Sequence, residues 1–135
     1  MDSDTGAVTM HIGELAEKTG LSLRTIRHYD EVGLLKPTGR TEGGFRLYTP
    51  DDFSRLMLIR RMKPLGFSLE EMTDLLRVID ALGGHDVSTK GPAVRRELDE
   101  FIGQADERRA KLEEQLGMAD EFLALLRAQQ NEHQR

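Results

Sequence analysis

The sequence predicts a mainly α-helical protein that carries one small β-hairpin and ends in a single long helix. Three patterns predict it: two short helical segments joined by a glycine, an alternating stretch behind paired glycines, and a seven-residue helical repeat over residues 92–130 that no Gly or Pro cluster breaks. Charged residues make up 32% of the chain and aromatic residues 5%. With 135 residues, the chain has room for one modest core and an extended element.

The first two helices are predicted to form a helix-turn-helix. In HIGELAEKTG the apolar residues fall in helical register and the pattern stops at Gly20. Gly20-Leu21-Ser22 is typical of a tight turn in which Ser22 caps the next helix, so the second helix should begin near Leu23. Two short helices joined by such a turn are the basic unit of many DNA-binding proteins.

The second helix should present a basic face to solvent. Leu23, Ile26 and Asp30 fall on one side at helical spacing, and the opposite side carries Arg24, Thr25, Arg27 and His28. Basic residues outnumber acidic ones over residues 22–63, although the whole chain has a formal net charge of -5. A concentrated basic face on an acidic chain favours double-stranded DNA as the partner.

A β-hairpin and two capped helices should follow. Phe45 to Tyr48 alternate apolar and polar behind a glycine pair, which predicts a hairpin with Arg46 and Tyr48 facing outward and Phe45 and Leu47 facing inward. Thr49-Pro50-Asp51-Asp52 carries the signals of a helix start, and Pro64 with Gly66 should end that helix. Ser68-Leu69-Glu70-Glu71 is a capping box that opens the next one.

The last helix should dimerise. Pro92 is expected to open it after a polar linker, and apolar residues then recur with the seven-residue spacing of a coiled coil. The predicted seam residues are Leu98, Ile102, Ala105, Leu112, Leu116, Ala119, Leu123 and Leu126. Arg109 interrupts the seam, and two glycines weaken the helix. Because nothing else in the chain is predicted to cover this stripe, we expect a homodimer.

The order of these elements resembles a known family. HIGELAEKTGLSLRTIRHYDEVGLLKP and GGFRLYTPDDFSRLMLIRRMKPLGFSLEEMTDLL resemble the N-terminal winged helix-turn-helix domain of the MerR family of transcriptional regulators over residues 11–76. The seam resembles the family's long antiparallel dimerisation helix. Two positions depart from the family pattern: His28 replaces the usual aromatic residue, and Pro64 interrupts a helix.

The resemblance implies a homodimer that binds a palindromic promoter operator, distorts the promoter spacer and so acts with RNA polymerase. Arg24 and Thr25, near the start of the second helix, are expected to read base edges. Further DNA contacts are expected from Arg27, His28, Tyr29, Lys36, Arg46, Tyr48, Arg60 and Arg61, with Arg40 and Lys63 as weaker candidates. The alternative is ordinary solvated surface for the cations and core packing for Tyr29.

Enzymatic and metal chemistry is not expected. The chain has no Cys, and His11, His28, His85 and His133 lack the spacing of metal ligands. The pairs Glu70-Glu71 and Glu113-Glu114 diverge on their helices, so no catalytic dyad, cofactor or metal site is predicted. A thiophilic metal is therefore not expected as the effector. A small molecule bound between the coil and the linker, a protein partner, and no ligand at all stay open.

The expected organisation is a disordered tail over residues 1–10, the DNA-binding domain over 11–82, a linker over 83–91, the dimerisation helix over 92–130 and a tail over 131–135. No signal peptide or membrane span is expected, and a cytoplasmic location fits the lack of Cys. Two other functions compete with promoter regulation: an architectural, excisionase-like DNA-bending protein, and a coiled-coil adaptor that does not bind DNA.

Overall fold

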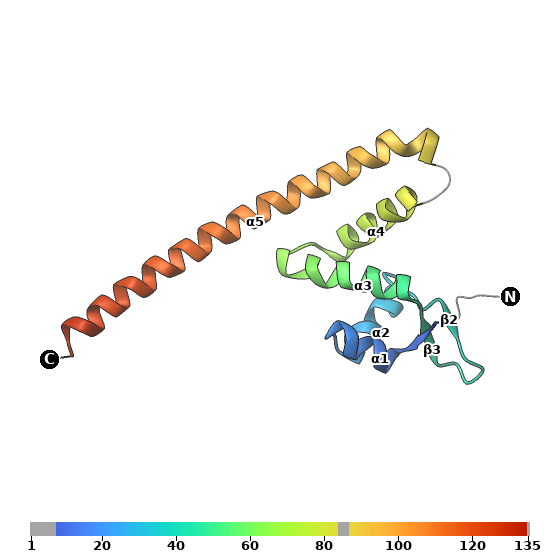
Figure 1. Cartoon of the computed structure of the whole chain (residues 1–135), viewed down its shortest axis with the longest axis horizontal. Helices are drawn as coiled ribbons and strands as arrows, with labels where there is room; N and C mark the ends of the chain where they lie inside the picture. Colours follow the sequence, from blue (N-terminus) through green and yellow to red (C-terminus); the bar gives the residue numbers. More distant parts are fainter. Residues whose placement is uncertain (1–7, 84–86, 135) are drawn as a thin grey trace. The chain divides into compact units, whose positions relative to one another are not determined.

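The computed structural model describes residues 8–83 and 87–134, and the chain divides into two compact units, Met1–Asp80 and Ala81–Arg135 (Figure 1). The first unit combines a small antiparallel sheet with short helices, and the second is dominated by one long helix. This is the mainly helical fold that the sequence predicts. Among the described residues, no helix is long and apolar enough to cross a bilayer.

The helix-turn-helix consists of α1 (Ile12–Thr19) and α2 (Leu23–Glu31). Gly20 ends α1 in the left-handed conformation, with φ 74°, a value that a residue with a β-carbon adopts only at a cost. The Ser22 hydroxyl accepts a hydrogen bond from the Thr25 amide at 3.0 Å. This bond confirms the predicted N-cap and fixes where α2 begins.

The sheet has three strands rather than the two of the predicted hairpin. They are β1 (Met10–His11), β2 (Gly39–Arg40) and β3 (Arg46–Tyr48), in the antiparallel order β1-β3-β2. Strands β2 and β3 form the expected wing. A disordered tail was predicted to extend to residue 10, and this bound is wrong, because Met10 is buried and pairs with Tyr48. Strand β1 has only two residues, which is too short for an alternation of apolar and polar residues to be recognised in the sequence.

The predicted orientation of the wing residues is also wrong. Tyr48 is fully buried, whereas Phe45 at the tip is 69% exposed. Alternation does place Arg46 and Tyr48 on one face, but that face is turned toward the rest of the unit. A period of two identifies which residues share a face and leaves open which face is inward. Here the burial of Tyr48, at the end of β3, shows that its face is the inward one.

The remaining helices of the first unit begin and end where the capping signals predict. In α3 (Pro50–Met62), Thr49 and Asp52 form a reciprocal capping box, with distances of 2.9 and 3.2 Å. The turn η1 (Lys63–Leu65) follows, and Gly66 ends it with φ 82°. Ser68 and Glu71 form a second box at the start of α4 (Leu69–Gly83), with distances of 2.8 and 3.1 Å.

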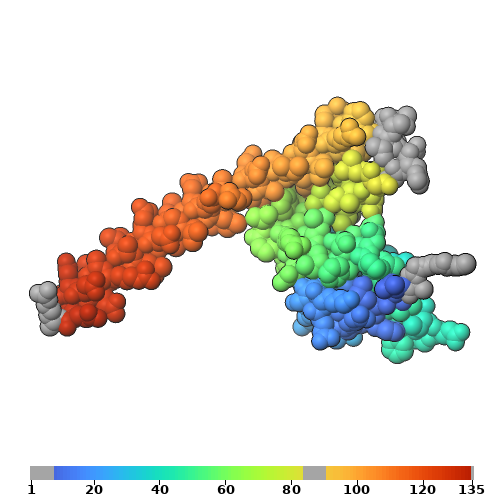
Figure 2. All heavy atoms as spheres, viewed as in Figure 1, coloured from blue at the N-terminus to red at the C-terminus, as the bar shows by residue number. Residues whose placement is uncertain are grey.

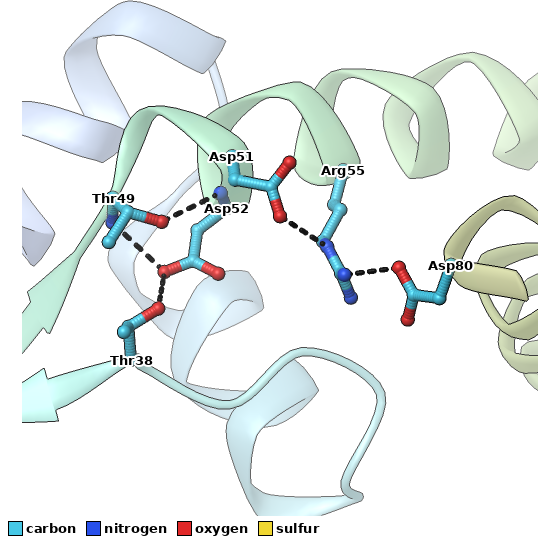
Figure 3. A network of polar contacts seen from close by, with 6 residues as sticks. All are labelled: Thr38, Thr49, Asp51, Asp52, Arg55 and Asp80. Carbon is cyan, nitrogen blue, oxygen red and sulfur yellow. Dashed lines mark hydrogen bonds and ion pairs between the residues drawn. The ribbon is translucent and has the colours of Figure 1, made fainter. Parts of the chain in front are cut away.

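A network of polar contacts joins the wing to α3 and α3 to α4 (Figure 3). The Thr38 hydroxyl donates to Asp52 Oδ2 at 2.5 Å, so the carboxylate that caps α3 also holds the segment leading into β2. Arg55 lies between Asp51, at 3.2 Å, and Asp80, with which it forms a short ion pair. Together with the apolar core, these contacts fix the wing and α4 on the α3 scaffold.

Helix α5 (Val87–Glu132) has 46 residues and forms one continuous rod (Figures 1 and 2). It begins before Pro92, which therefore lies inside the helix rather than at its start. The predicted linker is too long, because Gly83 belongs to α4 and the chain is helical again from Val87; residues 84–86 lie outside the described part. A proline one turn inside the helix forfeits a single hydrogen bond, which the flanking turns tolerate.

Candidate nucleic-acid interface

The outer face of α2 carries the predicted basic residues. Arg24, Arg27 and His28 are exposed, while Thr25 is half-buried. The Thr25 hydroxyl lies 2.9 Å from that of Ser22, so the cap also orients this side chain. Leu23 was expected to face inward and is instead exposed, because the first turn of α2 extends beyond the core that Ile26 closes. The face is thus basic, with one apolar residue at its start.

A hollow of about 410 Å³ adjoins this face, between α2 and the turn η1. It is lined by Arg24, Thr25, His28, Tyr29, Glu31 and Lys63. Three of these six side chains are basic types, so the hollow suits an anionic group more than an apolar one. Lys63 was only a weak candidate from the sequence, since nothing in a sequence places residue 63 beside residues 24 to 31.

Two predicted tyrosine contacts are mostly inside the protein. Tyr29 is 4% exposed and meets only the hollow; burial raises the pKa of its hydroxyl, which therefore stays protonated at neutral pH. Tyr29 is thus packed in the core, and a DNA contact through the hollow stays a prediction. Burial also raises the pKa of Tyr48, whose hydroxyl has no hydrogen-bond partner in the described part of the chain. Tyr48 in this position cannot touch DNA, and that prediction is wrong.

Both arginines of the wing contact one acid of α2. Asp30 Oδ2 accepts from Arg46 Nε at 2.8 Å and from Arg40 Nη2 at 3.2 Å. The hydrogen bond to Asp30 raises the pKa of Arg46, which is always charged in any case. Arg40 also donates to the Gly44 carbonyl at 3.1 Å and so braces the tip of the wing. Arg46 therefore forms an ion pair with Asp30, whereas the sequence predicts a cation that is free to contact DNA.

The other predicted cations are exposed. Lys36, Arg60 and Arg61 all reach solvent. The Arg60 guanidinium lies over the turn of the helix-turn-helix, where a β-carbon on residue 20 would come within 3.6 Å of Nη2. Arg61 donates to the Met57 carbonyl at 3.3 Å. Within residues 8–83 and 87–134, no cluster of His, Asp or Glu has the geometry to hold a metal ion.

Two helices around a glycine turn, followed by a two-stranded wing and a helix pair, define a winged helix-turn-helix protein. The description "MerR HTH family regulatory protein" matches residues 10–79. The regulator CueR from Salmonella typhi is 34% identical over 102 residues, which cover 74% of each chain. The chain belongs to the MerR family of helix-turn-helix transcriptional regulators, which is a DNA-binding and non-enzymatic class.

Two further proteins define the extent of the likeness. A mercuric resistance operon regulatory protein from Bacillus cereus is 48% identical over 69 residues, which are 51% of this chain and 52% of that one. A crystal structure of HiNmlR, a MerR family regulator lacking the sensor domain and bound to promoter DNA, covers 92% of this chain and 94% of that chain, with 27% identity and a TM-score of 0.72. The present chain thus spans about half the length of the mercuric resistance protein.

Proposed function

We propose that this protein binds a palindromic promoter operator as a homodimer and regulates transcription from that promoter. The single observation that carries the proposal is the exposed basic face of α2, held by a capped N-terminus beside a hollow to which Lys63 adds one further cation. The crystal structure of HiNmlR bound to promoter DNA supports it, because that protein matches nearly the whole of this chain.

In this proposal α2 is the recognition helix. Its N-terminal residues Arg24 and Thr25 meet base edges in the major groove, where an arginine can donate two hydrogen bonds to guanine and a threonine methyl can contact thymine. His28 and Lys63, which line the hollow, and the exposed Arg27 hold phosphates. Lys36, Arg60 and Arg61 add phosphate contacts that supply affinity without sequence information.

The dimer is proposed to form through α5. Every residue from 111 to 134 is exposed in the single chain, including the seam residues Leu112 and Leu116. Burying such a stripe against a second copy removes apolar surface from water at about 25 cal/mol per Å². A two-fold dimer presents two copies of α2, which explains why the operator should be palindromic.

Regulation is proposed to act on RNA polymerase through the shape of the promoter. A bound dimer that shortens or twists the spacer changes how polymerase aligns with the promoter elements, at an elastic cost of roughly 1 to 6 kcal/mol for the DNA. Since the target is chromosomal DNA, the proposal includes a cytoplasmic location. For the effector, three alternatives stay open: a small molecule bound beside α5, a protein partner, or no ligand at all.

Affinity for DNA measured over a salt series is the first test. We expect log affinity to fall linearly with log salt, with a slope of about -0.9 for each phosphate neutralised. Absence of salt-dependent binding would favour the adaptor function. Transcription measured from the bound promoter then separates regulation from architectural bending, since a pure bending protein binds without changing the amount of transcript.

A further inference from the structure

One buried carboxylate joins the recognition helix to both strands of the wing. Asp30 lies one residue before the end of α2, and its side chain is only 9% exposed. A single oxygen, Oδ2, accepts hydrogen bonds from Arg46 of β3 and Arg40 of β2. These two arginines are direct partners in the β2-β3 pairing, so the carboxylate contacts the wing across its full width.

The contact joins elements that are far apart in the sequence. Asp30 and Arg46 are 16 residues apart, and Asp30 and Arg40 are 10 apart. An exposed pair of this kind contributes little, but a buried carboxylate that loses its partners is costly. The acid therefore requires both arginines in place, which fixes the angle between α2 and the wing.

We propose that Asp30 is a positioning residue for operator recognition. It holds Arg40 and Arg46 so that the wing and α2 reach the DNA at a fixed separation. Arg46 thus contributes to DNA binding through its ion pair with Asp30, which positions the wing, as well as through its charge. This inference rests on the proposed function, because it assigns to Asp30 the geometry of the same DNA-binding surface.

The charge of Asp30 gives the proposal a distinctive consequence. Replacing it with Asn removes the ion pair with both arginines and one negative charge close to the DNA-binding surface. Random DNA, which responds to charge alone, should then bind as tightly as before or more tightly. Operator DNA requires the correct geometry as well, so its affinity should fall. A residue with a merely structural role would lower both affinities together as folded protein is lost.

An exposed acid of α1 supplies a control of equal charge. Glu17 lies on α1, is exposed, and does not line the hollow beside α2. Asp30→Asn and Glu17→Gln each remove one negative charge from the first unit, and only the first removes the ion pair with the wing. The probes are the duplex that the wild-type protein selects from a random pool and a scrambled duplex of equal length and composition.

We expect the ratio of operator to scrambled affinity to fall about tenfold or more in Asp30→Asn and to stay within about twofold of wild type in Glu17→Gln. Arg46→Gln should lower the ratio in the wild-type background and change it little in the Asp30→Asn background, because the ion pair is already absent. Equal ratios in Asp30→Asn and Glu17→Gln, or additive effects of Asp30→Asn and Arg46→Gln, would overturn the proposal.

A measurement on the wild type covers the case in which Asp30→Asn does not fold. The Nε proton of Arg46 should exchange slowly with solvent in the free protein and stay protected in the operator complex, as seen by NMR. Rapid exchange in either state would show that the ion pair does not position the wing. Failure of the wild type to bind either duplex would refute the proposed function instead, so the two failures are distinguishable.

Discussion

The two units of the chain treat the same apolar side chains in opposite ways. In the first unit Leu15, Ile26 and Leu56 are fully buried by residues of their own chain. On α5, Leu112 is 46% exposed and Leu116 is 63% exposed, although they fall on the apolar stripe of the predicted seam. The first unit completes its own core, whereas the stripe on α5 is left uncovered in the single chain and is the surface proposed to dimerise. Stability of the fold and formation of the dimer should therefore be separable by mutation.

The largest effect should come from the seam. Replacing Leu112 and Leu116 together with Asp should give monomers, because each helix would then bring two negative charges to the dimer contact. Operator affinity should fall about 100-fold or more as two linked half-sites become independent. Sedimentation velocity measures the first result. Met118 and Leu125, exposed residues outside the seam, provide the control: their double Asp variant should stay dimeric. A wild-type monomer at micromolar concentration would contradict the dimer.

A leucine in each unit sharpens the comparison. Leu56→Ala should lower the free energy of unfolding by about 2 to 5 kcal/mol, because it leaves a cavity in a closed core. Leu112→Ala should instead weaken the dimer and leave the melting of the first unit unchanged. Thermal unfolding followed at several protein concentrations separates the two. Equal, concentration-independent losses for both variants would show that α5 is part of the same folded core.

Base reading should show a smaller, local effect. Arg24→Ala should cost on the order of 1 to 3 kcal/mol for each lost bidentate contact and relax the preference at one position of each half-site. Binding to a set of single-base operator variants measures it. Arg127→Ala, an exposed arginine of α5, is the matched control and should leave the preference intact. An unchanged preference in Arg24→Ala would remove this residue from the reading face.

The cap of α2 predicts a loss of about 1 kcal/mol. Ser22→Ala removes the acceptor of the Thr25 amide and should destabilise the first unit by that amount. Ser54→Ala, an exposed serine within α3, should change stability far less. Chemical denaturation of both variants gives the comparison, and indistinguishable midpoints for the two would argue against the cap.

The smallest change should come from Tyr48. Its buried hydroxyl has no partner among the described residues, so Tyr48→Phe removes an unsatisfied group and should leave stability unchanged or raise it by up to about 1 kcal/mol. DNA affinity should not change. Chemical denaturation and the DNA-binding assay measure the two quantities. A marked loss of DNA affinity would restore the sequence prediction that Tyr48 is a contact.

Local signals predicted much of this fold. The caps at Ser22, Thr49 and Ser68 and the stop at Gly66 depend on residues within four positions of one another, and the structure confirms each of them. The basic face of α2 was predictable for the same reason, since helical spacing alone decides which residues point away from Ile26.

Long-range contacts were not predictable. The strand at Met10 exists because β3 pairs with it 38 residues later, and the burial of Tyr48 depends on that same pairing. Nothing local distinguishes Arg46 as a partner of Asp30 from Arg46 as a free cation. The start of α5 before Pro92 was missed because proline is a stronger signal than the weak helical pattern ahead of it.

Selection of DNA from a random pool by the purified full-length protein tests the central claim most directly. A homodimer with two copies of α2 should enrich a palindrome whose half-sites are related by two-fold symmetry. Arg24→Ala, selected in parallel, should lose one base preference in both halves. Enrichment of a single unpaired half-site would contradict the symmetric dimer, and no enrichment at all would contradict sequence-specific promoter binding.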